Sequence, residues 1–486
     1  MPDVVLPPLN LAEVQRSVAT ELDRIAPVID ELGALFEAAG HELALVGGPV
    51  RDAMLGRHHN DLDFTTSARP DETERLLRTW ARSDRGSAIW DMGRAFGTIG
   101  CRKGEWDVEV TTYRSESYDP SSRKPEVDFG DSLDGDLGRR DFTVNAMAVR
   151  LPGREVEDPY GGVVDLAHRV LRTPGRPEDS FSDDPLRMMR AARFAAQLGF
   201  TVDESVVAAM TAMADRIQII SAERVRDELV KLICAPYPRL GLQLLVETGL
   251  AAQVLPELPA LSLERDEHHR HKDVYEHTLT VLEQAIALED RLGGEPDFVS
   301  RFAALMHDVG KPRTRKFVDD GTVTFHHHDV VGAKLTRKRM KALRFSNDQI
   351  ESVSKLVELH LRFHGYGTGE WTDSAVRRYV RDAGDQLERL HVLTRADCTT
   401  RNQRKADRLR RTYDELEERI ARLSEEEELA SIRPDLDGTQ IMEILGIGPG
   451  REVGAAYKFL LELRMDNGPM SEEDARAALL AWAAER

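Results

Sequence analysis

Two aspartates separated by one residue, Asp61 and Asp63, have the clearest capacity for chemistry in this sequence. On a strand, alternate side chains point to the same face, so the two carboxylates would lie side by side. Like charges held so close are stabilised by bound cations or by a shared proton. Oxygen ligands of this kind favour Mg²⁺. An isolated Asp-x-Asp is equally compatible with a solvated turn. The surrounding residues must therefore distinguish a metal-binding pair from such a turn.

The preceding segment has the pattern of a phosphate-binding turn. Residues 43–47 are apolar and predict a strand, Gly47 and Gly48 interrupt it, and a helical pattern begins at Val50. Residues 61–65 predict the next strand. Backbone N–H groups of a glycine-rich turn can approach a phosphate closely. The turn and the two carboxylates together indicate two-metal phosphoryl or nucleotidyl transfer.

Composition sets outer limits on the function. The chain has 486 residues, which is room for roughly three domains. Its net charge of −19 means that any nucleic-acid surface must be a local basic patch on an acidic body. The three widely spaced cysteines, at positions 101, 234 and 398, indicate neither a disulfide framework nor a zinc knuckle, and predict a reducing, cytoplasmic setting. We expect no signal peptide and no membrane span.

The predicted elements divide the chain into a β-containing part and a helical part. Residues 11–39 predict a helix, and helical periodicity dominates from about residue 180 onward. Residues 113–133 are polar and predict a long mobile loop, which is often functional. A histidine-rich region, 266–364, predicts a separate module. The predicted strands are residues 43–47, 61–65, 97–101, 106–112, 143–150 and 155–157.

Several short motifs, in order, resemble those of the class II tRNA nucleotidyltransferases, which are CCA-adding enzymes with bacterial poly(A) polymerases as close relatives. The motifs are residues 47–52, 61–66, 139–146, 158–162, 183–187 and 221–224. The resemblance covers about residues 40–260. It implies an α+β fold in which a small mixed-sheet head precedes a helical neck. It also implies addition of C, C and A to tRNA 3′ ends from CTP and ATP.

A third carboxylate would complete the metal site on the side of the attacking hydroxyl. Asp107 and Glu109 both lie on the predicted strand 106–112 and face the same side of it. The family pattern, a Glu before an apolar residue and two threonines, implies Glu109, with Asp107 as the alternative. The expected catalytic, Mg²⁺-binding set is therefore Asp61, Asp63 and Glu109.

The resemblance also implies a nucleotide-binding set. Arginine forks suit phosphates, and an Asp or Asn suits a ribose hydroxyl. Arg187 and Arg190 belong to this set, and Arg193 continues their three-residue spacing. The set is Gly48, Arg51, Arg140, Asp141, Asn145, Asp184, Arg187 and Arg190.

Asp184 and Arg187 are the predicted base-selecting pair. At i and i+3 on a helix they would share a face. Cytosine and adenine both present an amino donor beside a ring-nitrogen acceptor, which a carboxylate and a guanidinium can match. Uracil and guanine present the reverse polarity and would leave groups unpaired, at about 1–3 kcal/mol each. The alternative interpretation is an ion pair on a helix surface.

The predicted loop 113–133 contains Arg123, Lys124 and Pro125, which resemble the basic-Pro element of the family. In the family this loop is tied to the switch from C to A addition. Its presence argues against an enzyme that adds only CC.

The histidine-rich module resembles the HD metal-dependent phosphohydrolase superfamily, with residues 305–312 as its central run. The resemblance implies phosphatase or cyclic phosphodiesterase activity on RNA ends. Spacing favours His328 over His326, and we expect the histidines at 268, 269 and 271 to be surface residues. The expected ligands of a transition metal or Mg²⁺ are His277, His307, Asp308 and Asp397 for one ion, and His328 and His360 for a second.

The whole chain is expected to comprise an N-terminal helical segment, a catalytic head, a neck, an HD domain and a helical tail that binds tRNA. Basic clusters at 334–341 and 401–411 are either phosphate contacts or solvated helix faces. Within the tail, residues 437–465 resemble the tail of many class II enzymes. The expected bounds are 1–39, 40–172, 173–260, 261–400 and 401–486.

Three other functions compete with CCA addition: poly(A) addition by the same head, an HD phosphohydrolase whose head only binds RNA, and a noncatalytic RNA-binding scaffold. A short tail without a long basic extension disfavours poly(A) addition. Two intact sets of candidate metal ligands disfavour the other two functions. The expected partners are the tRNA 3′ end, CTP and ATP, with no membrane and no stable protein partner.

Overall fold

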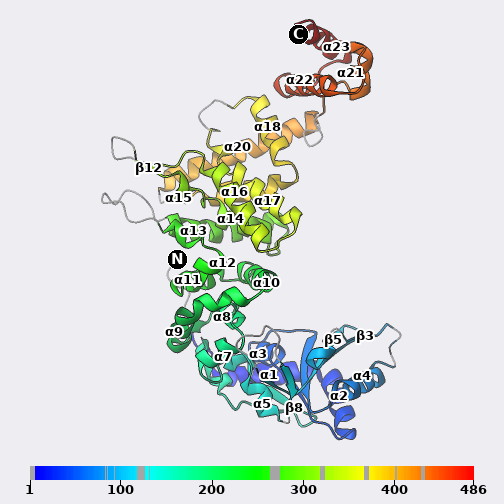
Figure 1. Ribbon diagram of the computed structural model, residues 1–486, viewed down its shortest axis with the longest axis vertical. Helices are drawn as coiled ribbons and strands as arrows, with labels where there is room; N and C mark the ends of the chain where they lie inside the picture. Colours follow the sequence, from blue (N-terminus) through cyan, green and yellow to red (C-terminus); the bar gives the residue numbers. More distant parts are fainter. Residues whose placement is uncertain are drawn as a thin grey trace. The chain divides into compact units, whose positions relative to one another are not determined.

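The computed structural model divides into two compact units, Met1–Pro256 and Glu257–Arg486 (Figure 1). It describes residues 6–82, 84, 86–91, 93–117, 126–130, 132–262, 274–317, 323–365, 371–399, 402–427 and 433–485. Each unit is described by itself below.

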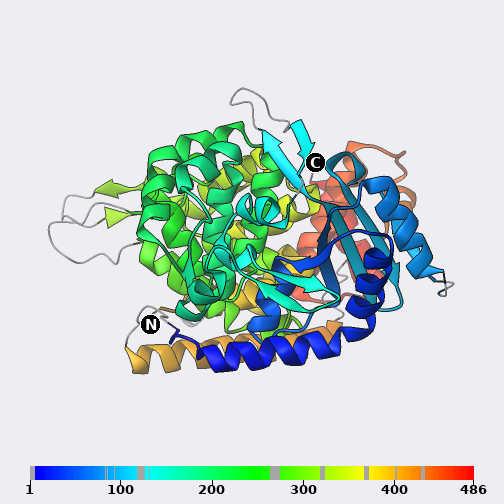
Figure 2. The same cartoon turned by 90° about the horizontal axis from the view of Figure 1, so that it is seen from below.

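The first unit begins with a mixed seven-stranded sheet in the order β3-β4-β5-β2-β1-β8-β9. Strands β2 and β5 run parallel, and the other neighbouring pairs are antiparallel. Helix α2 packs on β1 and β8 through fully buried Leu32 and Phe36. It and α1 run along one side of the head in dark blue (Figure 2). The bounds are α1 Leu11–Arg24, α2 Ala26–Ala38, β1 Leu43–Val46, β2 Asp61–Thr66, β3 Ala88–Trp90, β4 Thr98–Lys103, β5 Trp106–Thr112, β8 Ala148–Leu151 and β9 Glu155–Glu157.

The turn after β1 forms because its two residues are glycines. Gly47 adopts a φ of 72°, which side-chain-bearing residues rarely take, and Gly48 opens α3 (Gly48–Met54). A Cβ atom on Gly47 would lie 2.8 Å from Nη1 of Arg140. The predicted strand–turn–helix is therefore confirmed, and the turn brings backbone close to an arginine.

The neck is helical, and its central helix α8 carries several of the predicted arginines. Helix α8 packs against α10 and α11. Gly241 permits the close approach of α11, because a Cβ atom there would lie 2.5 Å from the carbonyl oxygen of Ala192 on α8. The elements are α7 Pro177–Asp183, α8 Leu186–Leu198, α9 Glu204–Met213, α10 Ala222–Ile233, α11 Pro238–Glu247 and α12 Leu250–Val254.

The second unit is almost entirely helical, as predicted. Its last three helices pack around a small core of their own that contains Leu436, Ile441, Leu460 and Leu479. The elements are α13 Val274–Ile286, α14 Phe298–Met306, α15 Lys311–Thr314, β12 Lys316–Phe317, β13 Val323–Thr324, α16 His328–Ala342, α17 Asn347–Leu359, α18 Asp373–Ala383, α19 Leu387–Ala396, α20 Gln403–Glu427, α21 Gly438–Leu445, α22 Arg451–Asn467 and α23 Glu472–Ala484. No helix among the described residues is long and apolar enough to cross a bilayer.

Three predicted elements were wrong in detail. The helix predicted over 11–39 is two helices that meet at Ile25, with Pro27 in the first turn of the second. The strand predicted over 143–150 begins as a 3₁₀ turn, Thr143–Asn145, before β8. The loop predicted over 113–133 contains a hairpin of β6 (Arg114–Ser117) and β7 (Glu126–Phe129). Its basic residues 123–125 lie outside the described part of the chain.

Replacement of Gly241 by alanine tests the packing that holds α8. A Cβ atom at this position meets a backbone carbonyl, which cannot rotate away, so we expect Gly241→Ala to lower the free energy of unfolding by about 1–3 kcal/mol. Urea denaturation followed by circular dichroism measures this. Gly175→Ala, where no atom lies within 4 Å of the new Cβ, is the matched control. Equal stability of the two variants would contradict the packing argument.

Candidate active sites

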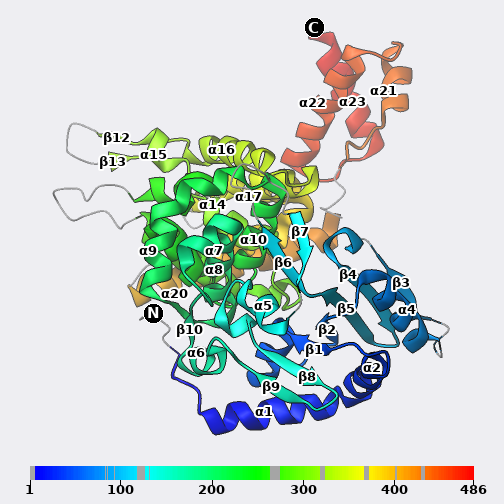
Figure 3. The same ribbon diagram turned by 60° about the horizontal axis from the view of Figure 1, so that its bottom comes forward.

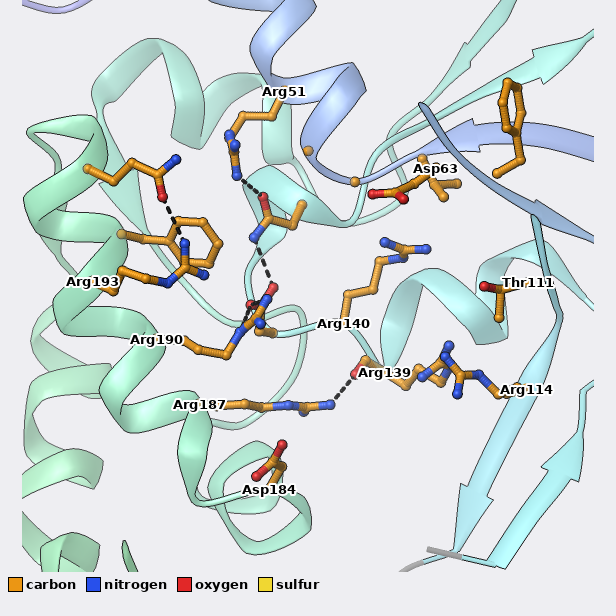
Figure 4. Close-up of a pocket in the computed structure, with 18 of the residues that line it drawn as sticks. Arg51, Asp63, Thr111, Arg114, Arg139, Arg140, Asp184, Arg187, Arg190 and Arg193 are labelled. Atoms are coloured by element: carbon orange, nitrogen blue, oxygen red, sulfur yellow. Dashed lines mark hydrogen bonds and ion pairs between the residues drawn. The ribbon is translucent and has the colours of Figure 1, made fainter. Parts of the chain in front are cut away.

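A polar cavity of about 580 Å³ lies in the first unit between the sheet and the neck (Figure 4). Its walls are rich in arginine, as a site for a polyanion requires. Most of the predicted nucleotide-binding residues line it. The lining comprises Val46, Gly47, Gly48, Arg51, Asp63, Phe64, Thr111, Arg114, Arg139, Arg140, Asp141, Asn145, Asp184, Arg187, Arg190, Arg193, Phe194, Gln197 and Arg224.

Of the three predicted metal ligands, Asp63 on β2 lines this cavity, and Asp61 and Glu109 are not among its lining residues. The parallel register of β2 and β5 puts Asp63 directly opposite Glu109, and Asp61 two residues away along β2. The Asp63 side chain is exposed at the cavity edge, but the protein around it removes part of its hydration. This desolvation raises the pKa of Asp63 to about 6. Glu109 and Asp61 raise the pKa further, and Arg140 opposes them. A cation would relieve this crowding of negative charge, so the donor set suits a divalent metal.

Asp107, the alternative third carboxylate, has another partner. Both of its oxygens accept hydrogen bonds from Arg102, at 2.6 Å each. Its partner in the register is Asp61, whereas Glu109 is the partner of Asp63, which lines the cavity. Glu109, opposite Asp63, has the better position for the third ligand.

A chain of buried hydrogen bonds joins the head to the neck. Arg190 donates a hydrogen bond to Asp141 at 2.7 Å and makes a second ion-pair contact with it at 2.6 Å, and Asn145 donates to Asp141 at 2.9 Å. Arg51 donates to Asn145 at 2.7 Å and holds Asp52 through its other two nitrogens. Burial alone would raise the pKa of Asp141, but Arg190 and Asn145 lower it to about 2. Four predicted site residues therefore share one network.

Asp184 lies between two helices and not on one, so the predicted i, i+3 helical face is wrong. It follows the last residue of α7 with extended backbone angles (φ −138°, ψ 100°), and Pro185 then starts the next helix. One carboxylate oxygen accepts from the backbone N–H of Leu186 at 3.0 Å. The other accepts from Arg224 at 2.9 Å. The carboxylate is therefore held in place from two sides.

Arg187 is held separately. It donates to the Ser180 hydroxyl at 2.8 Å and to the backbone carbonyl of Arg139 at 2.5 Å. Figure 4 shows Asp184 and Arg187 close to each other at the same side of the cavity. Asp184 and Arg187 therefore lie on one wall of the cavity, as the predicted base-selecting pair requires. The break between α7 and α8 places them there, and not the shared helical face that their spacing predicted.

The arginines nearer the glycine turn converge on one buried acid. Arg139 and Arg140 donate to Asp136 at 2.9 and 3.3 Å. Arg140 also lies against Gly47, and its Nε atom is buried with no hydrogen-bond partner among the described residues. An oxyanion beside this turn would have both backbone and guanidinium donors.

Ten lining residues were absent from the predicted sets, and Arg114, Phe194, Gln197 and Arg224 are four of them. Arg114 comes from the start of β6, and Arg224 from the first turn of α10. The Phe194 ring lies 3.9 Å from the Arg193 guanidinium and 5.5 Å from that of Arg190. Gln197 accepts a hydrogen bond from Arg193 at 2.8 Å. Among these four, only the motif containing Arg224 gave a sequence signal, because the others are ordinary helix or strand residues.

A second constellation lies inside the second unit, around Asp308. Its carboxylate is within 3.5 Å of a ring nitrogen of His277 and within 3.3 Å of those of His307 and His328. Asp397 is 3.0 Å from His277. Within the described residues, ligand atoms of three side chains lie within 4.8 Å of one another in two sets that share Asp308: with His277 and His307, and with His328 and His360. All six predicted HD residues therefore meet.

The histidines of this centre are oriented as metal ligands. Nδ1 of His307, His328 and His360 bonds to the carbonyl oxygens of Ala304, Phe325 and Val357 at 2.8, 2.8 and 2.6 Å. This bond sets the proton on Nδ1 and leaves Nε2 as an acceptor. The three Nε2 atoms are buried and have no hydrogen-bond partner among the described residues. Unsatisfied inward-facing nitrogens fit a metal centre.

Charge in this centre is strongly coupled. Burial would raise the pKa of Asp308, but His307, His328 and Lys311 hold it well below its usual range. Burial and the neighbouring His307 lower the pKa of His360 to about 4. A carboxylate that stays ionised and an imidazole that stays neutral are the protonation states that metal ligands need. Of the three adjacent histidines, His328 faces the centre and His326 is exposed, while 268, 269 and 271 lie outside the described residues.

Three protein families match consecutive parts of the sequence. The family described as Poly A polymerase head domain matches residues 43–172. The probable RNA and SrmB-binding site of polymerase A matches 199–261, and the HD domain matches 274–402. The carboxylates and the glycine turn therefore fall in the first of these matches, and the HD centre falls in the third. Asp184 and Arg187 lie between the first match and the second.

Relatives align over most of the chain. The A-adding tRNA nucleotidyltransferase of Deinococcus radiodurans is 34% identical over 450 residues, covering 91% of this chain and 96% of the relative. The CC-adding tRNA nucleotidyltransferase of Thermus thermophilus is 32% identical over 446 residues, covering 90% and 93%. The CCA-adding enzyme of Levilactobacillus brevis is 41% identical over 231 residues, covering 47% and 55%.

The fold has counterparts among solved structures. The Bacillus stearothermophilus CCA-adding enzyme in complex with CTP matches with a TM-score of 0.61 and 22% identity, covering 98% of each chain. The predicted α+β class, with a mixed-sheet head and helical remainder, is confirmed.

Asp308 belongs to both ligand sets, so its removal tests the second centre most directly. We expect Asp308→Asn to retain at least one equivalent less metal than the wild type after loading with Mn²⁺ and dialysis, measured by inductively coupled plasma mass spectrometry. Asp329→Asn, on the same helix as His328 but outside both sets, is the control. Equal metal content in the two variants would contradict a centre at Asp308.

Proposed function

Because this chain belongs to the tRNA nucleotidyltransferase family, we propose that it adds C, C and A to the 3′ ends of tRNA from CTP and ATP, with release of pyrophosphate. The observation that carries the proposal is the cavity in which Asp63, the glycine turn and the Asp184–Arg187 wall face one space. A site that only bound RNA would not need crowded carboxylates beside a phosphate turn.

In this proposal the head carboxylates hold Mg²⁺ and the arginines hold the nucleotide. Asp61, Asp63 and Glu109 would bind two ions, which supply activation of the tRNA 3′-hydroxyl and neutralisation of the leaving pyrophosphate. Gly48 and Arg140 would bind the triphosphate through backbone and guanidinium donors. The protein otherwise contributes position, because little covalent chemistry is required of it.

Base choice would rest on the wall of the cavity. Asp184 accepts from the amino group of cytosine or adenine, and Arg187 donates to the adjacent ring nitrogen. Both side chains are already fixed by protein contacts, so little ordering is required when the base arrives. The hydrogen-bond network around Asp141 would keep this wall at a fixed distance from the turn that holds the phosphates. Its members are Arg51, Asp141, Asn145 and Arg190.

A second candidate is addition of only part of the CCA sequence. It is supported by the two relatives that align over nearly the whole chain, one A-adding and the other CC-adding. The cavity alone does not separate full from partial addition.

The HD centre is proposed to bind a transition metal or Mg²⁺ and to remove phosphate or open a cyclic phosphate at RNA ends. His277, His307, Asp308 and Asp397 would hold one ion, with His328 and His360 for a second. Bound metal would supply an activated water at neutral pH. Lys311, 2.5 Å from Asp308, places a cation beside this carboxylate.

Three tRNA transcripts, ending before C74, after CC and after CCA, separate the candidates. We expect C, C and A to be added to the first and A alone to the second, with none added to the third. Single-nucleotide gel resolution with each triphosphate alone and with CTP plus ATP measures this. A product that stops at CC, or growth only from the CC transcript, would replace the proposal by partial addition. Long A tracts would indicate a poly(A) polymerase.

The carboxylate assignment is tested in the same assay. We expect Glu109→Gln to lower the rate of incorporation by about 10²–10³-fold, since it removes charge where metals and developing charge meet. Asp107→Asn, on the same strand but paired with Arg102, is the control and should change the rate by less than about threefold. If the Asp107 variant loses the activity and the Glu109 variant keeps it, the third ligand is misassigned.

A further inference from the structure

We propose that the second unit carries a binding surface for single-stranded RNA that leads to the HD centre. The basic surface consists of the arm 311–317, with the sequence Lys-Pro-Arg-Thr-Arg-Lys-Phe, and one face of α16. The inference goes beyond nucleotide addition in the head and names the substrate class of the HD centre, a polymer end. Only the assignment of the HD substrate rests on the proposed HD activity, and the RNA-binding surface does not.

Three cations of the arm, Arg313, Arg315 and Lys316, have no acidic partner among the described residues, whereas Lys311 pairs with Asp308. Within residues 274–317 and 323–365, no ion pair involves Arg313, Arg315 or Lys316. Arg313 and Lys316 are exposed. In a chain with a net charge of −19, such a run concentrates positive charge. Free cations beside one another fit a polyanion.

The same holds for one stripe of α16. Lys334, Lys338 and Lys341 are exposed and lie at i, i+4 and i+7, so they share a face of the helix. Within the described residues none of the three has an ion-pair partner, whereas Arg337 and Arg339 of the same helix are paired with carboxylates at 3.0 and 2.8 Å. The stripe extends about 10 Å along the helix, a length that suits successive phosphates of one strand.

An exposed aromatic ring distinguishes the surface from a simple basic patch. Phe317 on β12 is 67% exposed, and the guanidinium of Arg315 lies 4.7 Å from its ring centroid. Aromatic rings next to cations bind unpaired bases by stacking, which a duplex cannot offer. The occupant is therefore single-stranded.

The arm and the stripe are fixed to each other and to the metal ligands. A Cβ atom on Gly310 would lie 2.0 Å from the carbonyl oxygen of His328, so α15 starts directly against the first turn of α16. Figure 3 shows β12, β13 and α15 beside the start of α16. His328 and Lys311 both contact Asp308. Because Lys311 at the start of the arm contacts Asp308, a strand on the arm would pass close to the HD centre.

Fluorescence anisotropy with a 5′-labelled single-stranded RNA octamer tests the surface in the full-length protein. We expect Lys338→Ala/Lys341→Ala to raise the Kd about tenfold and to reduce the slope of log K against log salt by about 1.4. Phe317→Ala should raise the Kd about fivefold or more, and Phe317→Trp should not. Arg75→Ala/Arg78→Ala, with the same change in charge on exposed head residues, is the control.

Equal Kd values and salt slopes for the lysine variant and the control would overturn the surface. Equal affinity of the wild type for a duplex of the same length would overturn the single-strand assignment. No nucleotide and no turnover enter this measurement, so its failure leaves nucleotide addition untouched.

Discussion

The buried carboxylate of Asp141 is the constraint on which the cavity depends. It lies where the catalytic head meets the helical neck, and the ion pair with Arg190 and the hydrogen bonds from Arg190 and Asn145 keep it ionised. Through Asn145 and Arg51 this anchor reaches the glycine turn, and through Arg190 it reaches α8. Removing one partner would leave a charge unpaired in the interior, which is far more costly than losing a surface ion pair. The network therefore fixes the distance between the phosphate-binding turn and the base-reading wall.

This arrangement separates the chemistry from the choice of base. The carboxylates belong to the sheet, where the parallel register of β2 and β5 sets Asp63 opposite Glu109. Asp184 and Arg187 belong to a break between two neck helices, and each is held by different neighbours. Changes in the wall can thus alter base choice without moving the metal ligands. In the second unit, too, neighbouring groups hold the site residues in place. The Nδ1 atoms of the histidines bond to backbone carbonyls, so their Nε2 atoms face one shared aspartate.

The sequence predicted those parts of the protein that local patterns determine. The strands with Asp61 and Glu109, the glycine turn and the helical remainder follow from periodicity and from residues with special backbone freedom. The break at Asp184 has a sequence signal that helical spacing alone overlooks, because Pro185 favours extended angles in the residue before it and suits the start of a helix. The hairpin β6–β7 was missed because β6 is polar and each strand is only four residues long. Phe194, Gln197 and Arg114 reach the cavity through tertiary packing alone, which a single sequence does not encode in any short motif.

The central claim is that the Asp184 carboxylate reads the amino group shared by cytosine and adenine. The most direct measurement compares kcat/KM for CTP with that for an analogue whose ring lacks the exocyclic amine, on tRNA without its CCA end. We predict that the wild type prefers CTP by about 10–100-fold, since the analogue leaves the carboxylate unpaired. Asp184→Ala should show no preference. The same preference in both proteins would mean that another group reads the base, and the account of the wall would be wrong.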